Sequence, residues 1–156
     1  MTNPQLEAAS KDRLVTLLFQ GTVLANSVLT IVSKRLPFFF KTRRFSLSFA
    51  LNTNRTVQCT YYLSFDPTAP ATGIPTGTPI FAQLGSIIFI VGDDETISVD
   101  HQTVAFQAGA YIKLHLSNSD GFPHTIFGYA EIEIIGRPDS DTTPNPNNST
   151  SPQVTR

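Results

Sequence analysis

The sequence has little cysteine, little charge and no tryptophan. Its single cysteine, Cys59, excludes an internal disulfide framework and a cysteine-based zinc site, because both need several thiols. Charged residues make up only 15% of the 156 residues, whereas about 25% is typical of soluble domains. We therefore expect other protein to cover a good part of the surface. The length fits one domain with a sizeable core.

Motifs for catalysis and cofactor binding are also missing. There is no GxSxG nucleophile elbow and no phosphate-binding P-loop. His101, His115 and His124 lie far apart in the sequence, whereas paired ligands on one strand face would be two residues apart. The acidic run at 93–95 could supply oxygen ligands to calcium, but a charged tight turn explains it equally well. The sequence thus predicts no catalytic residue, no metal site and no cofactor, and we expect a protein that is not an enzyme.

The net charge of −1 conceals a division along the chain. Residues 1–60 carry eight basic and two acidic side chains, and residues 61–156 carry three basic and ten acidic ones. If the two halves emerge on different faces, the molecule is electrically bipolar and can attract its own copies or an acidic platform. Strands that interdigitate would erase this asymmetry.

A twenty-residue stretch without charge runs from Leu14 to Ser33. Its length is that of a membrane span, but seven polar side chains and Gly21 interrupt it, so a membrane anchor is disfavoured. The spacing favours a short helix or a first strand, a turn near Gly21, and a strand from about Val28 to Leu36. We take 1–27 as an N-terminal arm or first element, and 28–136 as the main domain.

Strict alternation of apolar and polar residues marks two segments in the middle of the chain. The first runs from Arg44 to Leu51 and the second from Thr56 to Phe65, with an Asn-rich turn between them. Period two is typical of half-buried strands, and two such runs around a short turn predict a β-hairpin. Cys59 falls in the inward series and is expected to be a small core residue.

Further short strands are expected at 80–84, 86–91, 96–99, 103–106, 111–117 and 125–135, after a Pro-rich and Gly-rich surface loop at 66–79. About eight strands separated by frequent turns predict an all-β, antiparallel sandwich. The inward positions of its strands form the predicted core: Phe45, Leu47, Phe49, Val57, Cys59, Tyr61, Leu63, Phe65, Ile112, Leu114, Leu116, Ile132 and Ile134. Lys113 and His115 fall in the outward series.

The last twenty residues, 137–156, contain four Pro, no aromatic residue and one aliphatic side chain, Val154. This composition predicts an extended tail that has too little apolar surface to order itself. A neighbouring subunit is the simplest candidate for holding it.

Basic residues gather around 34–44. They alternate with three phenylalanines but lack the glycines and stacking pattern of a nucleic-acid site, so no nucleic-acid binding is expected. A docking surface for an acidic protein partner fits the charge division better. The residues predicted for this platform are Lys34, Arg35, Lys41, Arg43 and Arg44.

The segment from Ile97 to Ile135 resembles the closing strands of jelly-roll virion proteins. The Ala108-Gly109 turn begins a strand of alternating aliphatic residues, a polar loop follows, and the last strand carries Gly128 after an aromatic residue. The resemblance implies a jelly-roll-like sandwich and a bacteriophage structural protein, namely a homotrimeric cement or decoration protein on the capsid surface. Its implied partners are other copies of itself and a major capsid or other virion protein.

Two other functions stay open. A carbohydrate-binding or receptor-binding module of a virion appendage would expose tyrosines, and Tyr62 and Tyr111 fall on outward positions while Tyr61 does not. Tyr129 is a further candidate. A membrane-associated virion protein would use 14–32 as its anchor.

Overall fold

The computed structural model describes residues 13–136, and every described element is a strand or a loop. The predicted tail at 137–156 and the first twelve residues of the predicted arm lie outside the described residues. The strands are β1 (Leu14–Val23), β2 (Val28–Val32), β3 (Phe39–Phe49), β4 (Val57–Ser64), β5 (Thr78–Pro79), β6 (Ala82–Gln83), β7 (Ser86–Ile87), β8 (Glu95–Asp100), β9 (Tyr111–Asn118) and β10 (His124–Gly136). The all-β prediction is confirmed.

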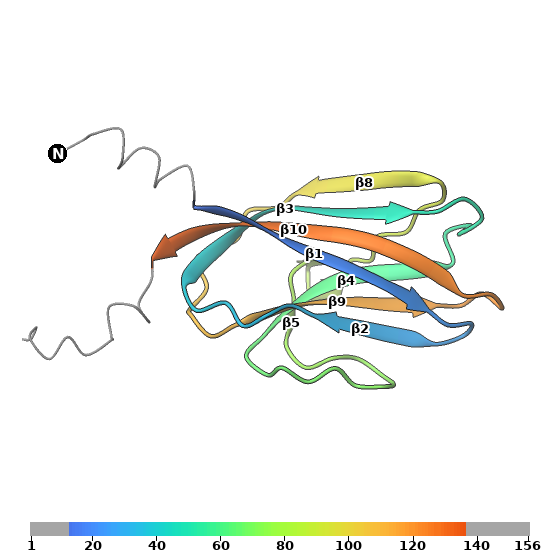
Figure 1. Ribbon diagram of the computed structural model, residues 1–156, viewed down its shortest axis with the longest axis horizontal. Coiled ribbons are helices and arrows are strands. Elements are labelled where there is room, and N and C mark those ends of the chain that lie inside the picture. Colours follow the sequence, from blue (N-terminus) through green and yellow to red (C-terminus); the bar gives the residue numbers. More distant parts are fainter. Residues whose placement is uncertain (1–12, 137–156) are drawn as a thin grey trace, which may run out of the picture.

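Eight of these strands form two four-stranded antiparallel sheets that pack face to face (Figure 1). The first sheet has the order β1-β10-β3-β8 and the second has the order β2-β9-β4-β5. The early strands pair with the late ones in reverse order: β1 with β10, β2 with β9, β3 with β8 and β4 with β5. The chain is therefore one long hairpin rolled into a sandwich, which is the jelly-roll topology. The β6-β7 hairpin is an insertion between β5 and β8.

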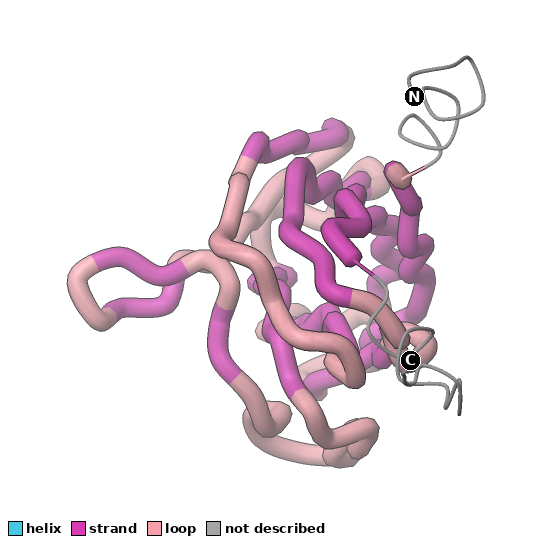
Figure 2. Tube along the Cα trace, turned by 90° about the vertical axis from the view of Figure 1, so that its left-hand side faces the viewer, coloured by secondary structure: helices cyan, strands magenta, loops and turns pink. Residues whose placement is uncertain are grey.

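The predicted core lies between the two sheets, whose layers Figure 2 shows from one end of the sandwich. Every predicted core residue except Phe65 is buried. Phe65 is 58% exposed because β4 ends at Ser64 and the alternation no longer sets its direction. The prediction was wrong there.

The predicted hairpin between β3 and β4 is also wrong. β3 pairs with β10 and β8, and β4 pairs with β9 and β5, so the two strands lie in opposite sheets. The connection between them takes left-handed backbone at Asn52, Asn54 and Arg55, with φ of 71°, 53° and 59°. Asparagine tolerates this region better than most residues, so the Asn-rich turn carries the chain from one sheet to the other.

The uncharged stretch near the N-terminus forms β1 and β2. β1 belongs to the sandwich, because all ten of its residues pair with β10. Of the alternatives predicted for 1–27, an arm or a first helix or strand, residues 14–23 form a strand. Within residues 13–136, no helix has the length and apolarity needed to cross a membrane.

Candidate interaction surface

The five residues of the predicted basic platform do not act as one unpaired cluster. Arg44 donates from Nε to Oδ1 of Asp100 at 2.6 Å, and Arg43 donates to Oε1 of Glu133 at 2.9 Å. Lys41 lies opposite Glu133 in the register, while Lys34 and Arg35 lie in the connection between β2 and β3.

The hydrogen bond between Arg44 and Asp100 lowers the pKa of the carboxyl and raises the pKa of the guanidinium. Both acidic partners come from strands of the acidic half, β8 and β10, which flank β3. The basic strand β3 thus lies between two strands that carry acidic side chains. Around β3 the basic and acidic halves of the chain are therefore not separated on different faces.

The outward face of the first sheet carries a second surface beside the Arg44–Asp100 pair, and its residue Tyr129 hydrogen-bonds to Arg44. Its central positions hold Leu18 on β1, Phe127 and Tyr129 on β10, and short polar side chains on the neighbouring strands. Leu18 is 81% exposed and Phe127 is 51% exposed. We call this surface the open face; it comprises Leu18, Gln20, Ser46, Ser48, Thr96, Phe127 and Tyr129.

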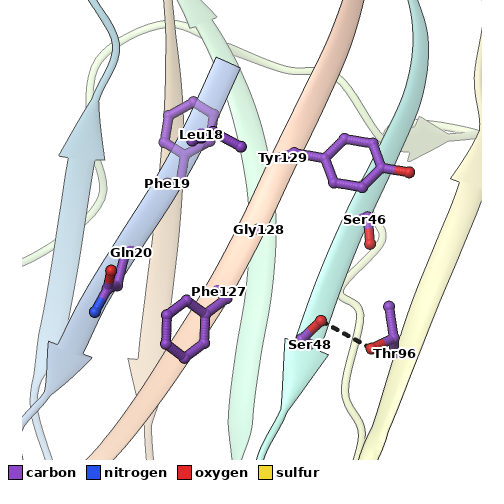
Figure 3. Close-up of a pocket in the computed structure, with 9 residues that line it drawn as sticks. All are labelled: Leu18, Phe19, Gln20, Ser46, Ser48, Thr96, Phe127, Gly128 and Tyr129. Atoms are coloured by element: carbon purple, nitrogen blue, oxygen red, sulfur yellow. Dashed lines mark hydrogen bonds between the residues drawn. The ribbon is translucent and has the colours of Figure 1, made fainter. Parts of the chain in front are cut away.

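A shallow depression of about 530 Å³ occupies the open face (Figure 3). Leu18 and Phe127 supply apolar surface, while Gln20 and a hydrogen-bonded pair, Ser48 and Thr96 (2.8 Å between the hydroxyl oxygens), supply polar groups. None of the residues that line it is charged. The depression can bind an uncharged partner with aromatic or aliphatic groups and scattered hydrogen bonds, and it contains no acid–base pair for catalysis.

A buried tyrosine supports the open face from below. Tyr61 of β4 reaches across the core, and its hydroxyl lies 3.1 Å from the carbonyl oxygen of Ser46 and 3.3 Å from that of Tyr129. Gly128 makes room for it, because a Cβ at that position would lie 2.6 Å from the hydroxyl oxygen. The glycine singled out in the sequence thus lets the second sheet brace the backbone of the first.

The outward face of the second sheet is covered by the chain itself. Tyr62, Lys113 and His115 lie in the outward register, as predicted, but all three are buried. The loop between β4 and β5 lies against this face with Ile74, and the segment after β7 adds Phe89; both side chains lie near Tyr62. Tyr62 cannot form an exposed platform, and of the tyrosines considered only Tyr129 lies in the open face.

Polar contacts fasten this loop to the sheet. The ammonium of Lys113 donates to Oγ1 of Thr76 at 3.0 Å, and the Thr76 hydroxyl donates to Oδ2 of Asp66 at 3.0 Å. Thr68 also donates to Asp66, and these hydrogen bonds lower the pKa of the Asp66 carboxyl. Because the loop brings a carboxylate near Lys113, the buried ammonium has a nearby compensating charge.

The structure brings no metal-binding group together in the part of the chain it describes. His115 is buried against Thr30, with 3.0 Å between Nδ1 and Oγ1, and burial lowers its pKa. Nε2 of His124 lies 2.8 Å from Oδ2 of Asp120. In the acidic run, Asp93 accepts a hydrogen bond from the backbone of Asn54, as a charged turn would.

No family model matches the sequence, and no curated protein matches it. Among solved structures, a chain of the infectious bursal disease virus Gx strain has a TM-score of 0.41 and 13% identity, over 78% of this chain and 32% of that one. The Yersinia pseudotuberculosis-derived mitogen has a TM-score of 0.38 and 10% identity, over 74% of this chain and 84% of that one. This chain spans about a third of the length of the viral chain. Likenesses this low assign no family.

Proposed function

We propose that this protein is a structural component of a virion, which stabilises a capsid by bridging neighbouring subunits and performs no catalysis. The observation that carries the proposal is the open face, an exposed aromatic and aliphatic surface without charge on a low-charge protein. Interface cores between proteins are enriched in aromatic residues and depleted in charge. Exposed apolar patches of this kind mark interaction sites.

The virion setting is supported by the topology and by the sequence. Jelly rolls of two four-stranded sheets are common in viral capsid proteins and in lectins. The closing strands β9 and β10 are the segment that resembles jelly-roll virion proteins. A bacteriophage origin and a place on the capsid surface are further parts of the proposal, and they rest on that resemblance alone.

The decisive test is binding to particles that lack this protein. Phe127→Asp places a charge in the centre of the open face, and because this side chain is half exposed, the fold tolerates it. We expect occupancy on particles, measured by co-sedimentation, to fall at least tenfold, or about 1.4 kcal/mol. Phe65→Asp is the matched control, since Phe65 is a similarly exposed aromatic residue directly after β4 of the other sheet. Full occupancy by the Phe127 variant would exclude the open face as the docking surface.

Lys34 tests the charged part of the proposal. Arg43 and Arg44 already have carboxylate partners, and reversing either charge would place two acids together within the protein. Lys34 is exposed, so Lys34→Glu changes the surface charge alone. We expect slower binding to an acidic platform and a weaker dependence on salt. Unchanged kinetics would remove the basic residues from the proposed docking surface.

Carbohydrate binding is the second candidate, because the depression combines an aromatic ring at Phe127 with the polar side chains of Gln20, Ser48 and Thr96. Jelly rolls also serve as lectins. Binding of the isolated protein to a glycan array, lost in Phe127→Ala, together with undiminished particle occupancy by that variant, would favour this candidate over the first.

A further inference from the structure

We propose that two copies of this protein pair through the free edge of β1, joining their first sheets into one eight-stranded sheet. The inference does not depend on the proposed virion role. It rests on the length, the composition and the hydrogen-bond register of β1.

β1 is an end strand of its sheet, and one edge of its ten-residue backbone has no neighbouring strand among the described residues. It contains no charged residue and no proline. Folded proteins normally protect such an edge with charge, proline or a bulge, because its free N–H and C=O groups are a template for another strand. At the other end of the same sheet, β8 is shorter and carries Glu95 and Asp100.

The register shows which groups of β1 are free. The amide of Ile134 donates to the carbonyl of Arg13 at 2.8 Å, next to the pair Leu14 and Glu133. In an antiparallel ladder, hydrogen-bonded positions alternate, so odd-numbered residues of β1 bond to β10. The even-numbered residues direct their N–H and C=O groups to the free edge: Leu14, Thr16, Leu18, Gln20 and Thr22.

A second copy of β1 satisfies all five of these residues in one register. When Leu18 lies opposite Leu18 of the second copy, Thr16 meets Gln20 and Leu14 meets Thr22. Each even residue then faces an even residue, and a symmetric pair forms about ten new backbone hydrogen bonds. A register centred on Thr16 or Gln20 leaves residues at one end unpaired. The two-fold axis at Leu18 is therefore the one that the free groups specify.

The side chains agree with this register. Leu18, the most exposed aliphatic residue of β1, meets its own copy at the axis. Half-buried Leu17 lies opposite Phe19 on the inner side, which extends the core across the junction. The nearest described cation, Arg13, turns its guanidinium away from the edge and donates to the carbonyl oxygen of Ile135.

Charge at residue 18 tests both the pairing and its register. Leu18→Lys or Leu18→Glu alone would place two like charges directly opposite each other, and each variant should have half the mass of the parent protein by light scattering. Mixing the two variants in equal amounts should restore the parent mass, with native mass spectrometry showing mixed pairs. Ser98→Lys on β8 is the matched control, an exposed position on the opposite edge of the sheet.

The outcomes separate cleanly. A monomeric parent protein overturns the proposal, and so does an association, trimeric included, that neither charge variant weakens. Failure of the mixture to recover the parent mass excludes the register centred on Leu18. Because Phe127 lies on β10, away from the edge, the particle-binding test of the open face can fail while this test succeeds.

Discussion

The inner faces of the two sheets are alike in the burial of their side chains, whereas their outer faces differ. Inside, both contribute fully buried aliphatic and aromatic side chains to one core. Outside, the second sheet is sealed by a loop of the same chain, while the first sheet leaves Leu18 and Phe127 exposed. Within residues 13–136, no loop of the chain covers the open face in the same way. This contrast between the two outer faces supports the open face as the proposed interaction surface.

The largest expected difference comes from removing an outward aromatic side chain on each sheet. Tyr62→Ala should lower the free energy of unfolding by about 3–5 kcal/mol, as for other buried aromatic residues, because Tyr62 is 2% exposed beneath the loop. Phe127→Ala should change it by no more than about 0.5 kcal/mol. Urea unfolding of both variants measures this contrast, and equal losses would mean that the loop does not seal the second sheet.

Removing a threonine hydroxyl on each sheet gives a second comparison between the two outer faces. Thr76→Val removes the hydroxyl that Lys113 and Asp66 share, which should cost about 1–3 kcal/mol and expose the loop to proteases. Thr96→Val removes the bond to Ser48 on the open face, where water replaces it, so the cost should be within about 0.5 kcal/mol. If limited proteolysis cuts both variants at the parent rate, these contacts do not hold the loop.

Thr60 provides a substitution that should stabilise the protein. Its hydroxyl is buried and has no hydrogen-bond partner. Thr60→Val keeps the shape and removes an unsatisfied polar atom, so the free energy of unfolding should rise by about 1 kcal/mol. A lower melting temperature in calorimetry would show that the hydroxyl has a role that the fold alone does not reveal.

The smallest effect concerns pH. Burial lowers the pKa of His115 below its ordinary value of about 6.5, so the unfolded chain takes up a proton before the folded one does. Stability should therefore fall as pH decreases through and below that value, and His115→Gln should flatten the dependence. His101→Gln is the control. Melting curves between neutral pH and the range where carboxyls titrate measure the difference; identical slopes in parent and variant would exclude His115 as the cause.

The sequence predicted the strands better than their partners. Alternation correctly identified the inward residues of β3, β4, β9 and β10, because period two reports which side of a strand is apolar. It could not report which strand lies alongside. A hairpin and a crossing between sheets give the same pattern, and only the long-range pairing of β3 with β10 decides between them.

The sequence also did not show that some outward-facing side chains of the second sheet are buried. Lys113 and His115 alternate with apolar residues as solvent-exposed side chains would, and nothing nearby in the sequence shows that residues 65–77 fold over them. The open face was missed for a related reason. Its residues come from four separate strands, β1, β3, β8 and β10, and none of them forms a motif along the chain.

The rolled hairpin also dictates when the protein can fold during its synthesis. The last two strands, β9 and β10, are not at the edges of their sheets; each lies between two earlier strands. Until they leave the ribosome, β1 and β2 have no neighbours, and β3 and β4 lack one of theirs. Before that, β4 can pair with β5, β6 with β7 and β3 with β8, and the pairs that are nearest in sequence close first. The nascent chain thus carries β1 without its neighbour from the synthesis of residue 23 until β10 has emerged, and the two four-stranded sheets are completed only after residue 136 has left the ribosome.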